Sequence, residues 1–228
     1  GPVDLTAGHY MFEQNLLYIE ERVVIGQPQA LVGGGDGEFS TWGAFVNADW
    51  HISEQFTFNL GVRYTEEEKS AVVSRIRSAL TPLDGAIVVP GEGVTGGSID
   101  GNFLVPSDTP FDLKWNDVSP RIGVQWQPTE STNLYAFAAK GFRSGGVNFR
   151  VTTLGTALDP QPPTAFDSEE QTSFEVGWKQ DFLDGRGRIN LAIFHNEIEG
   201  MQRETNLPGP SGVQQVIVNA GDATLQGI

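Results

Sequence analysis

The chain has 228 residues and no cysteine, so it is long enough for one or two ordinary domains and is not a small secreted domain held by disulfides. Cytosol, periplasm and outer membrane all remain open as locations. Fourteen Lys and Arg residues against 29 Asp and Glu residues give a formal net charge of -15. Such a chain repels the phosphates of DNA and RNA, and no nucleic-acid partner is expected.

Alternation of apolar and polar residues recurs along the whole sequence, whereas no helical stripe with caps appears. In the segment FTFNLGVRYT, residues 56–65, one side of a strand is apolar and the other is polar. The same alternation predicts about eight strands, over residues 9–25, 39–52, 56–78, 113–127, 131–149, 169–182, 186–205 and from 213 onward.

Short turns and long connections alternate between these strands. The turns are SEQ (53–55), PTES (128–131) and LDGRG (183–187), and the long connections are 79–112, 151–168 and 207–212. All short turns therefore fall at one end of the sheet, which is typical of transmembrane barrels and less regular in soluble sandwiches. We expect 79–112 and 151–168 on the cell exterior and the short turns in the periplasm.

The apolar sides of the strands must contact either a second sheet or lipid. No run of about 18 apolar residues exists, but a transmembrane strand needs only about 9 to 11 residues and alternates. Large rings gather near the short turns, as in the aromatic girdles of barrels, although ordinary core positions would also explain them singly. These rings are Trp50, Phe56, Trp126, Tyr135 and Phe182.

Motifs for bound ligands are weak. GEGVTG (91–96) has the spacing of a dinucleotide fingerprint, but it follows Pro90 and runs into GGSIDG instead of opening a helix. GGGDGEF (33–39) is one copy of a calcium-repeat-like pattern, and one copy cannot stack with neighbours. We expect this segment to be a flexible loop.

No set of catalytic or metal-binding residues stands out either. His9, His51 and His195 lie on separate segments without partners at metal-ligand spacing, and Ser144 in RSGGV is not a nucleophile elbow. The carboxylates of 66–69 and 167–170 are expected to be solvated. The sequence therefore predicts no catalytic residue, no bound metal, no cofactor and no enzymatic activity.

The segments 119–148, 166–202 and 219–228 resemble the barrel of TonB-dependent outer-membrane receptors, and 45–69 is similar to an upstream hairpin of that family. The resemblance rests on an ordered series: SPR, LYA with KGFRSGG, E-x-GWK, and GR-x-x-N-x-A-x-F. It covers most of residues 39–228, and the long loops are unmatched.

This resemblance implies an antiparallel transmembrane β-barrel in the cell outer membrane, surrounded by outer-membrane lipid. The family's barrel has 22 strands around an N-terminal plug and imports a scarce cargo, such as a ferric siderophore, cobalamin or a carbohydrate, with energy from the TonB complex. Residues 1–228 are expected to be a partial barrel of about eight strands, since neither a plug nor the segment that contacts TonB precedes them and the sequence stops at Gly227-Ile228. No cargo-binding residue follows from the resemblance, so the substrate-binding residues stay unassigned.

Two other classes remain: a complete eight-stranded structural or adhesive barrel, and an outer-membrane lipid hydrolase. For the receptor, we expect an incompletely closed sheet, because its strands are too few to surround a plug. Phe58, Leu60 and Val62 should face lipid, and Asn59, Arg63 and Thr65 should face the lumen. The lumen-facing residues expected to contact plug and wall are Arg63, Arg121, Glu175 and Lys179.

Overall fold

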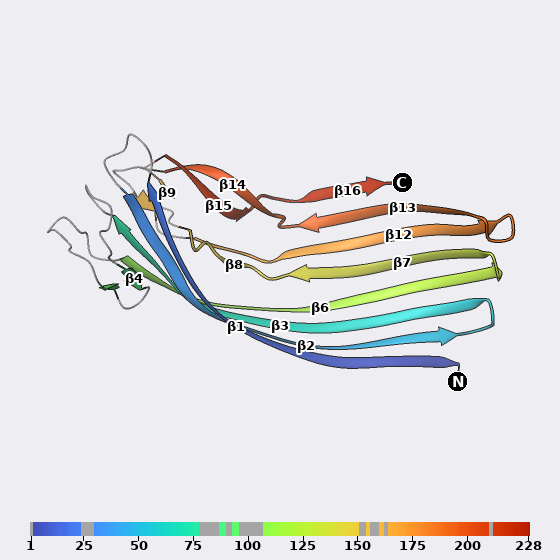
Figure 1. Ribbon diagram of the computed structural model, residues 1–228. Helices are drawn as coiled ribbons and strands as arrows, with labels where there is room; N and C mark the ends of the chain where they lie inside the picture. Colours follow the sequence, from blue (N-terminus) through green and yellow to red (C-terminus); the bar gives the residue numbers. More distant parts are fainter. Residues whose placement is uncertain are drawn as a thin grey trace.

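One antiparallel sheet of eight strands dominates the computed structural model (Figure 1). The structure describes residues 2–23, 30–77, 87–89, 93–95, 107–150, 154–155, 160–161, 164–209 and 212–228. The sheet contains, in spatial order, β1 (Val3–Val23), β2 (Ala30–His51), β3 (Phe56–Arg77), β6 (Ser107–Thr129), β7 (Thr132–Arg143), β12 (Glu169–Phe182), β13 (Gly187–Glu199) and β16 (Ala223–Gly227).

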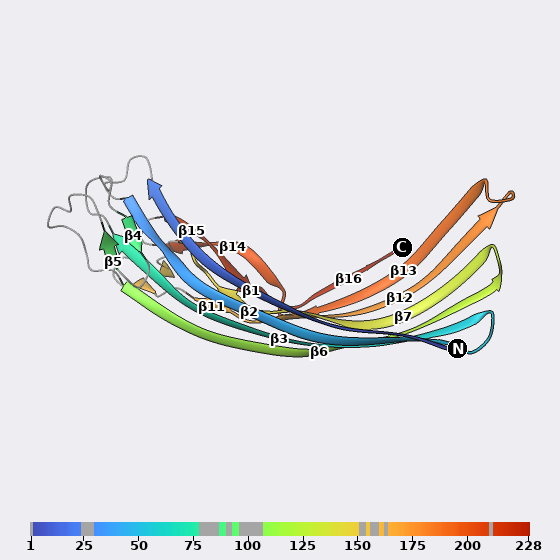
Figure 2. The same cartoon turned by 60° about the horizontal axis from the view of Figure 1, so that its bottom comes forward.

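The sheet is open. β1 and β16 lie at its two ends and are not paired with each other in the described part of the chain. The sheet is also curved, and the small strands β14 (Gln202–Gly209) and β15 (Gly212–Asn219) lie within its curve (Figure 2). The expected antiparallel, incompletely closed barrel of about eight strands is thus confirmed. A complete eight-stranded barrel is not, because these strands do not close on themselves.

Three predicted strands are interrupted, and the first, over 131–149, is β7 followed by the short β8 (Gly146–Val147). The segment expected as one strand over 186–205 is β13 followed by β14, and the segment from 213 onward is β15 followed by β16. Gly200 and Gly221 lie at the latter two breaks with φ values of 62° and 118°, a backbone region that glycine enters without steric cost. The chain therefore leaves the sheet as a separate β14–β15 hairpin and returns to pair with β13.

The expectation of a flexible loop at GGGDGEF is wrong, because residues 33–39 belong to β2. Gly35 and Gly37 leave room on the sheet for the ring of Phe149. A Cβ atom on Gly35 would lie only 2.0 Å from Cδ1 of Phe149. Glycine is thus required here by the close approach of a ring, and not by a turn.

The expected division between the two ends of the sheet is confirmed. The turns at 53–55, 130–131 and 183–186 lie at one end, and the small hairpins of the long connections lie at the other (Figure 1, right and left). These hairpins include β4 (Ile87–Val89) with β5 (Gly93–Thr95), β9 (Leu154–Gly155) with β10 (Pro160–Gln161), and β14 with β15. Residues 93–95 of GEGVTG form β5 paired with β4, and its other residues lie outside the described ranges.

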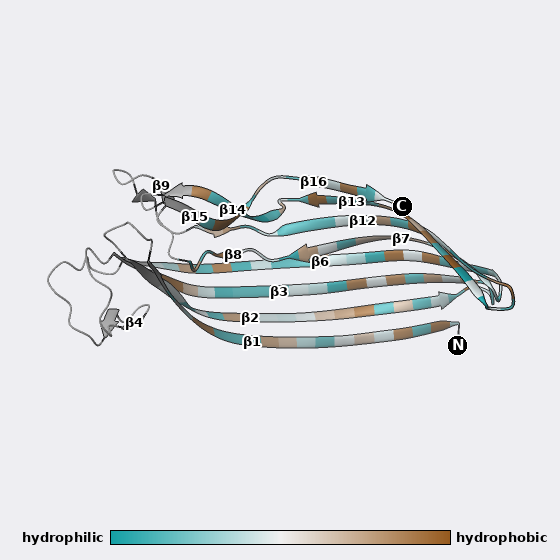
Figure 3. Cartoon of the chain, turned by 45° about the horizontal axis from the view of Figure 1, so that its top comes forward, coloured by the Kyte–Doolittle hydropathy of each residue, from teal (hydrophilic) through white to brown (hydrophobic). Residues whose placement is uncertain are grey.

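The outer face of the sheet is the face that carries Phe58, Leu60 and Val62. Apolar side chains on it form register-matched rows, for example Trp50, Phe58 and Val124. The colouring in Figure 3 shows hydrophobic segments alternating with hydrophilic ones along the strands, mainly in the half nearer the short turns. The exposed apolar side chains on this face include Val3, Leu5, Val46, Trp50, Leu60, Val62, Val118, Ile122, Phe174, Val176, Leu191 and Ile193.

Aromatic pairs border this apolar band. Phe56 and Trp126 stack with ring centroids 5.6 Å apart near the short turns, and Trp42 and Tyr64 are 5.3 Å apart nearer the long connections. Apolar bands between aromatic girdles characterise outer-membrane barrels. Tyr135 is an exception to the expected girdle, because its ring covers Gly177 on the inner face. The described part of the chain contains no helix that is long and apolar enough to cross a membrane.

Candidate functional site

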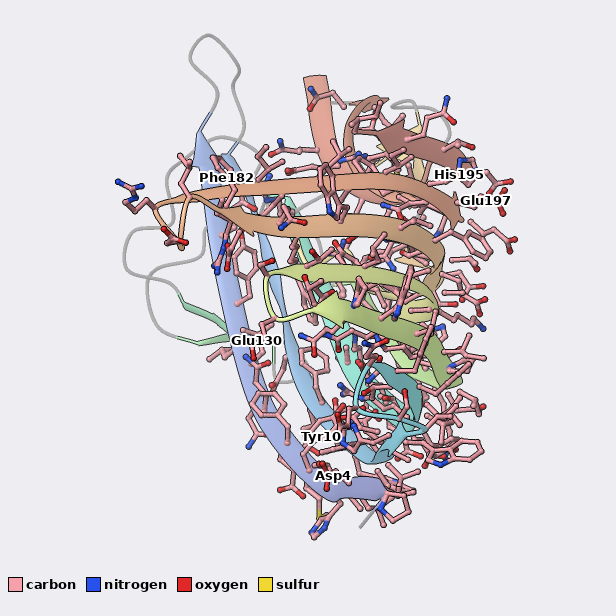
Figure 4. All side chains as sticks on the ribbon, turned by 90° about the vertical axis from the view of Figure 1, so that its right-hand side faces the viewer. Asp4, Tyr10, Glu130, Phe182, His195 and Glu197 are labelled. Carbon is pink, nitrogen blue, oxygen red and sulfur yellow. The ribbon has the colours of Figure 1, made fainter. Side chains whose placement is uncertain are left out.

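The inner face of the sheet carries Asn59, Arg63 and Thr65, as the alternation predicts. Viewed from the short-turn end, Tyr10 lies on this inner side, whereas His195 and Glu197 project from the opposite side (Figure 4). Asn59 donates a hydrogen bond of 2.6 Å to Asp49 on the neighbouring strand. Thr65 is only 7% exposed, which is less than most residues of the outer band.

Cations on the inner face lie over aromatic rings. Arg63 lies 4.6 Å from the ring centroid of Tyr10 and also donates to the Tyr10 hydroxyl. The Arg121 guanidinium lies 4.1 Å from the Phe137 centroid, and the Lys179 ammonium lies 5.2 Å from that of Tyr135. Such contacts stabilise by about 0.5–1 kcal/mol where exposed. The expected contacts of these residues with a plug stay a prediction.

Glycines on the neighbouring strands leave space for several of these rings, because they have no Cβ atom. Tyr10 is the register partner of Gly43, and Tyr135 is that of Gly177. A Cβ atom on Gly43 would lie 2.4 Å from the Tyr10 ring, and one on Gly177 would lie 2.2 Å from the Tyr135 ring. The rings therefore lie directly against the backbone of the adjacent strand.

Residues 144–150, here called the strap, leave the end of β7 and cross the inner face. Ser144 and Asn148 are buried, with 8% and 6% of their surfaces exposed. The Lys69 ammonium donates to Ser144 Oγ at 2.7 Å and to the Gly145 carbonyl at 2.6 Å. Ser144 in turn donates to Glu67. These contacts fix the start of the strap to β3.

The far end of the strap reaches β2 and the β14–β15 hairpin. Phe149 covers Gly35 and Gly37, and its ring contacts Phe39 edge to face with centroids 6.1 Å apart. Arg150 donates to Glu204 on β14 at 3.1 Å and to Gln215 on β15. The strap thus links the sheet to the hairpin that lies within its curve.

Side-chain amides strengthen this link. Asn148 donates to the Ile217 carbonyl at 2.9 Å and accepts from the Ile217 amide at 2.8 Å. Buried Gln202 donates to the carbonyls of Ser144 and Asp167, each at 2.9 Å. Its Oε1 atom is buried and has no partner among the described residues. Gly146 and Val147 of the strap pair with β11 (Ala165–Phe166) in a short ladder. Where the strap meets β15, the amide of Asn148 satisfies the backbone groups of Ile217 instead.

Two ionisable groups at the strap lie beyond the apolar band and have shifted pKa values. Burial is the main cause that lowers the pKa of Lys69, the Glu67 carboxylate opposes this shift, and the charge of Arg143 adds a smaller lowering. The pKa of Asp167 is also below its usual value, chiefly because Trp115 Nε1 donates to its carboxylate at 2.9 Å. The expectation that the carboxylates of 66–69 and 167–170 are all solvated is thus too simple. Glu67 accepts from Ser144 of the strap, and Asp167 accepts from Trp115.

The structure joins residues that are distant in the sequence and that no motif reveals. His51 contacts Asp4 and Thr57, each at 2.9 Å, through the pairing of β1, β2 and β3. His195 contacts Glu197 at 3.3 Å. Among the described residues, no group of His, Cys, Asp and Glu side chains is suited to a metal ion. Ser144 does meet Lys69 and Glu67, but the strap buries this contact.

A hollow of about 510 Å³ opens on the inner face beside the strap. Residues of β6, β7, β12 and β13 surround it. The β6–β7 pairing ends beside it at Arg121 and Ala139, and the β7–β12 pairing ends at Arg143 and Glu169. The hollow is lined by Arg121, Phe137, Ala139, Lys140, Gly141, Phe142, Arg143, Glu169, Gln171, Ser173, Glu175 and Asn196. Arg121 and Ala139 share the inner face with Asn59, so the hollow opens on that face.

Curated proteins that the chain resembles are outer-membrane receptors of much greater length. The metal-pseudopaline receptor CntO of Pseudomonas aeruginosa (strain UCBPP-PA14) is 29% identical over 212 residues, which are 90% of this chain and 24% of that protein. The pesticin receptor of Yersinia enterocolitica is 24% identical over 188 residues, which are 82% of this chain and 22% of that protein. This chain spans about a quarter of the length of these relatives.

A solved structure shows the same fold. The ferric yersiniabactin uptake receptor FyuA from Yersinia pestis superposes with a TM-score of 0.70 and 18% identity, covering 100% of this chain and 29% of that one. The family model described as "TonB dependent receptor-like, beta-barrel" matches residues 6–228. The chain therefore belongs to the β-barrel family of TonB-dependent receptors, which are transport proteins of the outer membrane and not enzymes.

Proposed function

We propose that the chain forms part of the barrel wall of a receptor that takes up a metal chelate by TonB-dependent transport. The relatives support this cargo class, because one is named for metal-pseudopaline and a structural neighbour for ferric yersiniabactin. In this proposal, residues 1–228 belong to the barrel, and a plug and further strands belong to the rest of a longer receptor.

The observation that carries the proposal is the contrast between the two faces of the sheet. Lipid offers no hydrogen bonds to the backbone, so a sheet in a membrane pairs its strands fully and presents apolar side chains outward. The outer face has this character, while the inner face carries Arg63, Arg121 and Lys179. A wall with an apolar outside and a polar inside encloses an aqueous or plugged lumen.

Energy must then come from outside the lumen. A plugged barrel passes cargo only when the plug moves or is remodelled, and the outer membrane has no nucleotide supply of its own. TonB is therefore the proposed partner, and it would act on the plug and not on residues of this chain.

The orientation in the membrane follows the lengths of the connections. We propose that 79–112 and 151–168 lie on the cell exterior and that the SEQ, PTES and LDGRG turns lie in the periplasm. Protease added to intact cells should then cut the full receptor only in the first set. Cleavage at Asp184-Gly185 without permeabilisation of the outer membrane would reverse this orientation.

Uptake measurements test the function directly. Cells that carry the full receptor should accumulate radiolabelled metal-pseudopaline or ferric yersiniabactin with saturable kinetics. Deletion of TonB or collapse of the proton gradient should abolish this uptake, whereas binding at the cell surface should persist. Uptake that rises linearly with concentration and is unchanged by either treatment would identify a diffusive pore and contradict the proposal.

A further inference from the structure

The hollow beside the strap has the size of a small-molecule site. Its volume of about 510 Å³ falls within the range of roughly 300 to 1,000 Å³ that is usual for such sites. Its lining includes two guanidinium groups, Arg121 from β6 and Arg143 from β7. The hollow faces the lumen, because Arg121 shares the inner face with Asn59 and Arg63.

The two arginines form no ion pair with a carboxylate of the described ranges. In the described part of the chain, neither Arg121 nor Arg143 forms an ion pair, although the sequence contains 29 acidic residues. Arg188 contacts Asp181 at 2.5 Å and Arg150 contacts Glu204 at 3.1 Å, whereas Arg63, like Arg121, lies over a ring and forms no ion pair with the described residues. In so acidic a chain, two unpaired guanidinium groups at one hollow leave cationic donors available to a ligand.

The acidic residues of the hollow have other partners. Glu169, the register partner of Arg143, accepts from the backbone amide of Gln202 at 2.5 Å, and Glu175 accepts from the Tyr135 hydroxyl at 2.6 Å. These partners are neutral, and neither carboxylate forms an ion pair with Arg121 or Arg143 among the described residues. The guanidinium carbon of Arg121 lies 4.1 Å from the centroid of the Phe137 ring. No carboxylate among the described residues accepts from its N–H groups, and the planar fork of a guanidinium suits a planar acceptor such as a carboxylate.

A positive charge next to the hollow supports an anionic ligand. Arg143 lies close enough to Lys69 to lower the pKa of its ammonium group, in addition to the larger effect of burial. Lys69 itself is held by Ser144 and Gly145, and the Glu67 carboxylate 3.5 Å away raises its pKa by more than Arg143 lowers it. An anion bound at Arg143 would offset the smaller repulsion between Arg143 and Lys69.

The spacing of the two arginines limits the ligand. Arg121 is the register partner of Ala139, and Arg143 follows four residues later on β7. At about 3.3 Å per residue, their backbones are roughly 13 Å apart along the strand. The long arginine side chains can shorten this separation. Two separate carboxylates on a ligand still fit the two guanidinium groups better than a single shared carboxylate does.

We propose that this hollow binds an anionic, carboxylate-bearing metal chelate, with Arg121 and Arg143 each contacting a different carboxylate. This inference rests on the proposed function and specifies the chemistry of its cargo. Arginine favours carboxylates because two parallel N–H donors match the two oxygen atoms. The hollow is then a binding site on the lumen wall that prefers anionic chelates over neutral ones.

Binding to the purified full receptor tests the assignment. The probes are iron(III) citrate, which carries carboxylates, and an iron(III) complex of a neutral trihydroxamate. Wild-type receptor should bind the citrate complex more tightly, and Arg121→Gln and Arg143→Gln should each weaken that binding by about tenfold. Neither variant should change the affinity for the neutral complex. Arg63→Gln is the matched control, since Arg63 also lies over a ring on the inner face but does not line the hollow.

The outcomes separate this inference from the proposed function. Equal weakening for both probes, unchanged binding of citrate, or a wild-type receptor without preference for the anionic probe would overturn the arginine assignment. TonB-dependent uptake of a metal chelate could persist in each of these cases, and the proposed function would then stand. All variants should be compared only after their heat-resistant barrel form is confirmed by gel electrophoresis.

Discussion

The two faces of β3 differ in a way that reverses the pattern of a soluble protein. On the outer face, Leu60 and Val62 are 46% and 41% exposed, whereas Thr65 on the inner face is 7% exposed. A soluble sheet would bury the first two and solvate the third. The surrounding medium, and not hydrophobicity alone, therefore decides which face of a strand is covered.

The largest effect is expected from Leu60→Arg in the full receptor. An arginine at the middle of the lipid-facing band costs about 2–4 kcal/mol, and assembly of the barrel should fall sharply. Asn59→Arg is the control, because residue 59 lies on the inner face beside the Asp49 carboxylate. The heat-resistant fraction on a gel measures assembly. Equal assembly of both variants would contradict the assignment of Leu60 to the lipid-facing side and of Asn59 to the lumen-facing side.

An intermediate effect is expected where the inner face supports the strap. In Gly35→Ala, the new Cβ atom would lie 2.0 Å from Phe149, and such overpacking costs about 1–3 kcal/mol. The ring should leave its place, and the Ile217 amide, which donates to Asn148, should exchange its hydrogen about tenfold faster.

Gly141→Ala provides the comparison for this variant. Its added Cβ atom would have its nearest neighbour at 3.9 Å, so exchange at Ile217 should remain as in the wild type. Exchange rates that do not differ between the two variants would mean that Phe149 does not hold the hairpin.

The smallest effect concerns Asp167, at the end of the inner face beyond the band. The Trp115 hydrogen bond lowers the pKa of Asp167, so this contact stabilises the fold above the ordinary Asp pKa and is lost as pH falls through the lowered value. Trp115 fluorescence should therefore change only in strongly acidic solution. Asp167→Asn should remove that step, and an identical titration of variant and wild type would refute the link.

The sequence determines the strands of the sheet better than the segments that leave it. Alternation predicts β3 and β12 almost to the residue, because each has one apolar face against lipid and a neighbour on both sides. It does not predict the β14–β15 hairpin, since that hairpin also alternates and is separated from β13 only by Gly200 and Met201. Period-2 patterns identify a strand but not its partner.

The site was less accessible from the sequence. The contact of Lys69 with Ser144 joins residues 75 positions apart, and no local pattern specifies it. GGGDGEF looked like a loop because glycine is usual in turns, while its glycines in fact receive a ring from the strap. The unpaired state of Arg121 and Arg143 could not be foreseen, because it depends on which acidic residues other strands bring close.

The pairing of glycines with rings across neighbouring strands has a consequence for inheritance. At Gly177 and Tyr135, neither residue can change freely alone: a larger residue 177 would strike the ring, and a smaller residue 135 would uncover the backbone. The effects of the two substitutions are therefore not additive. The unit on which selection acts at this part of the wall is the pair, and a lineage that alters one member is expected to alter the other.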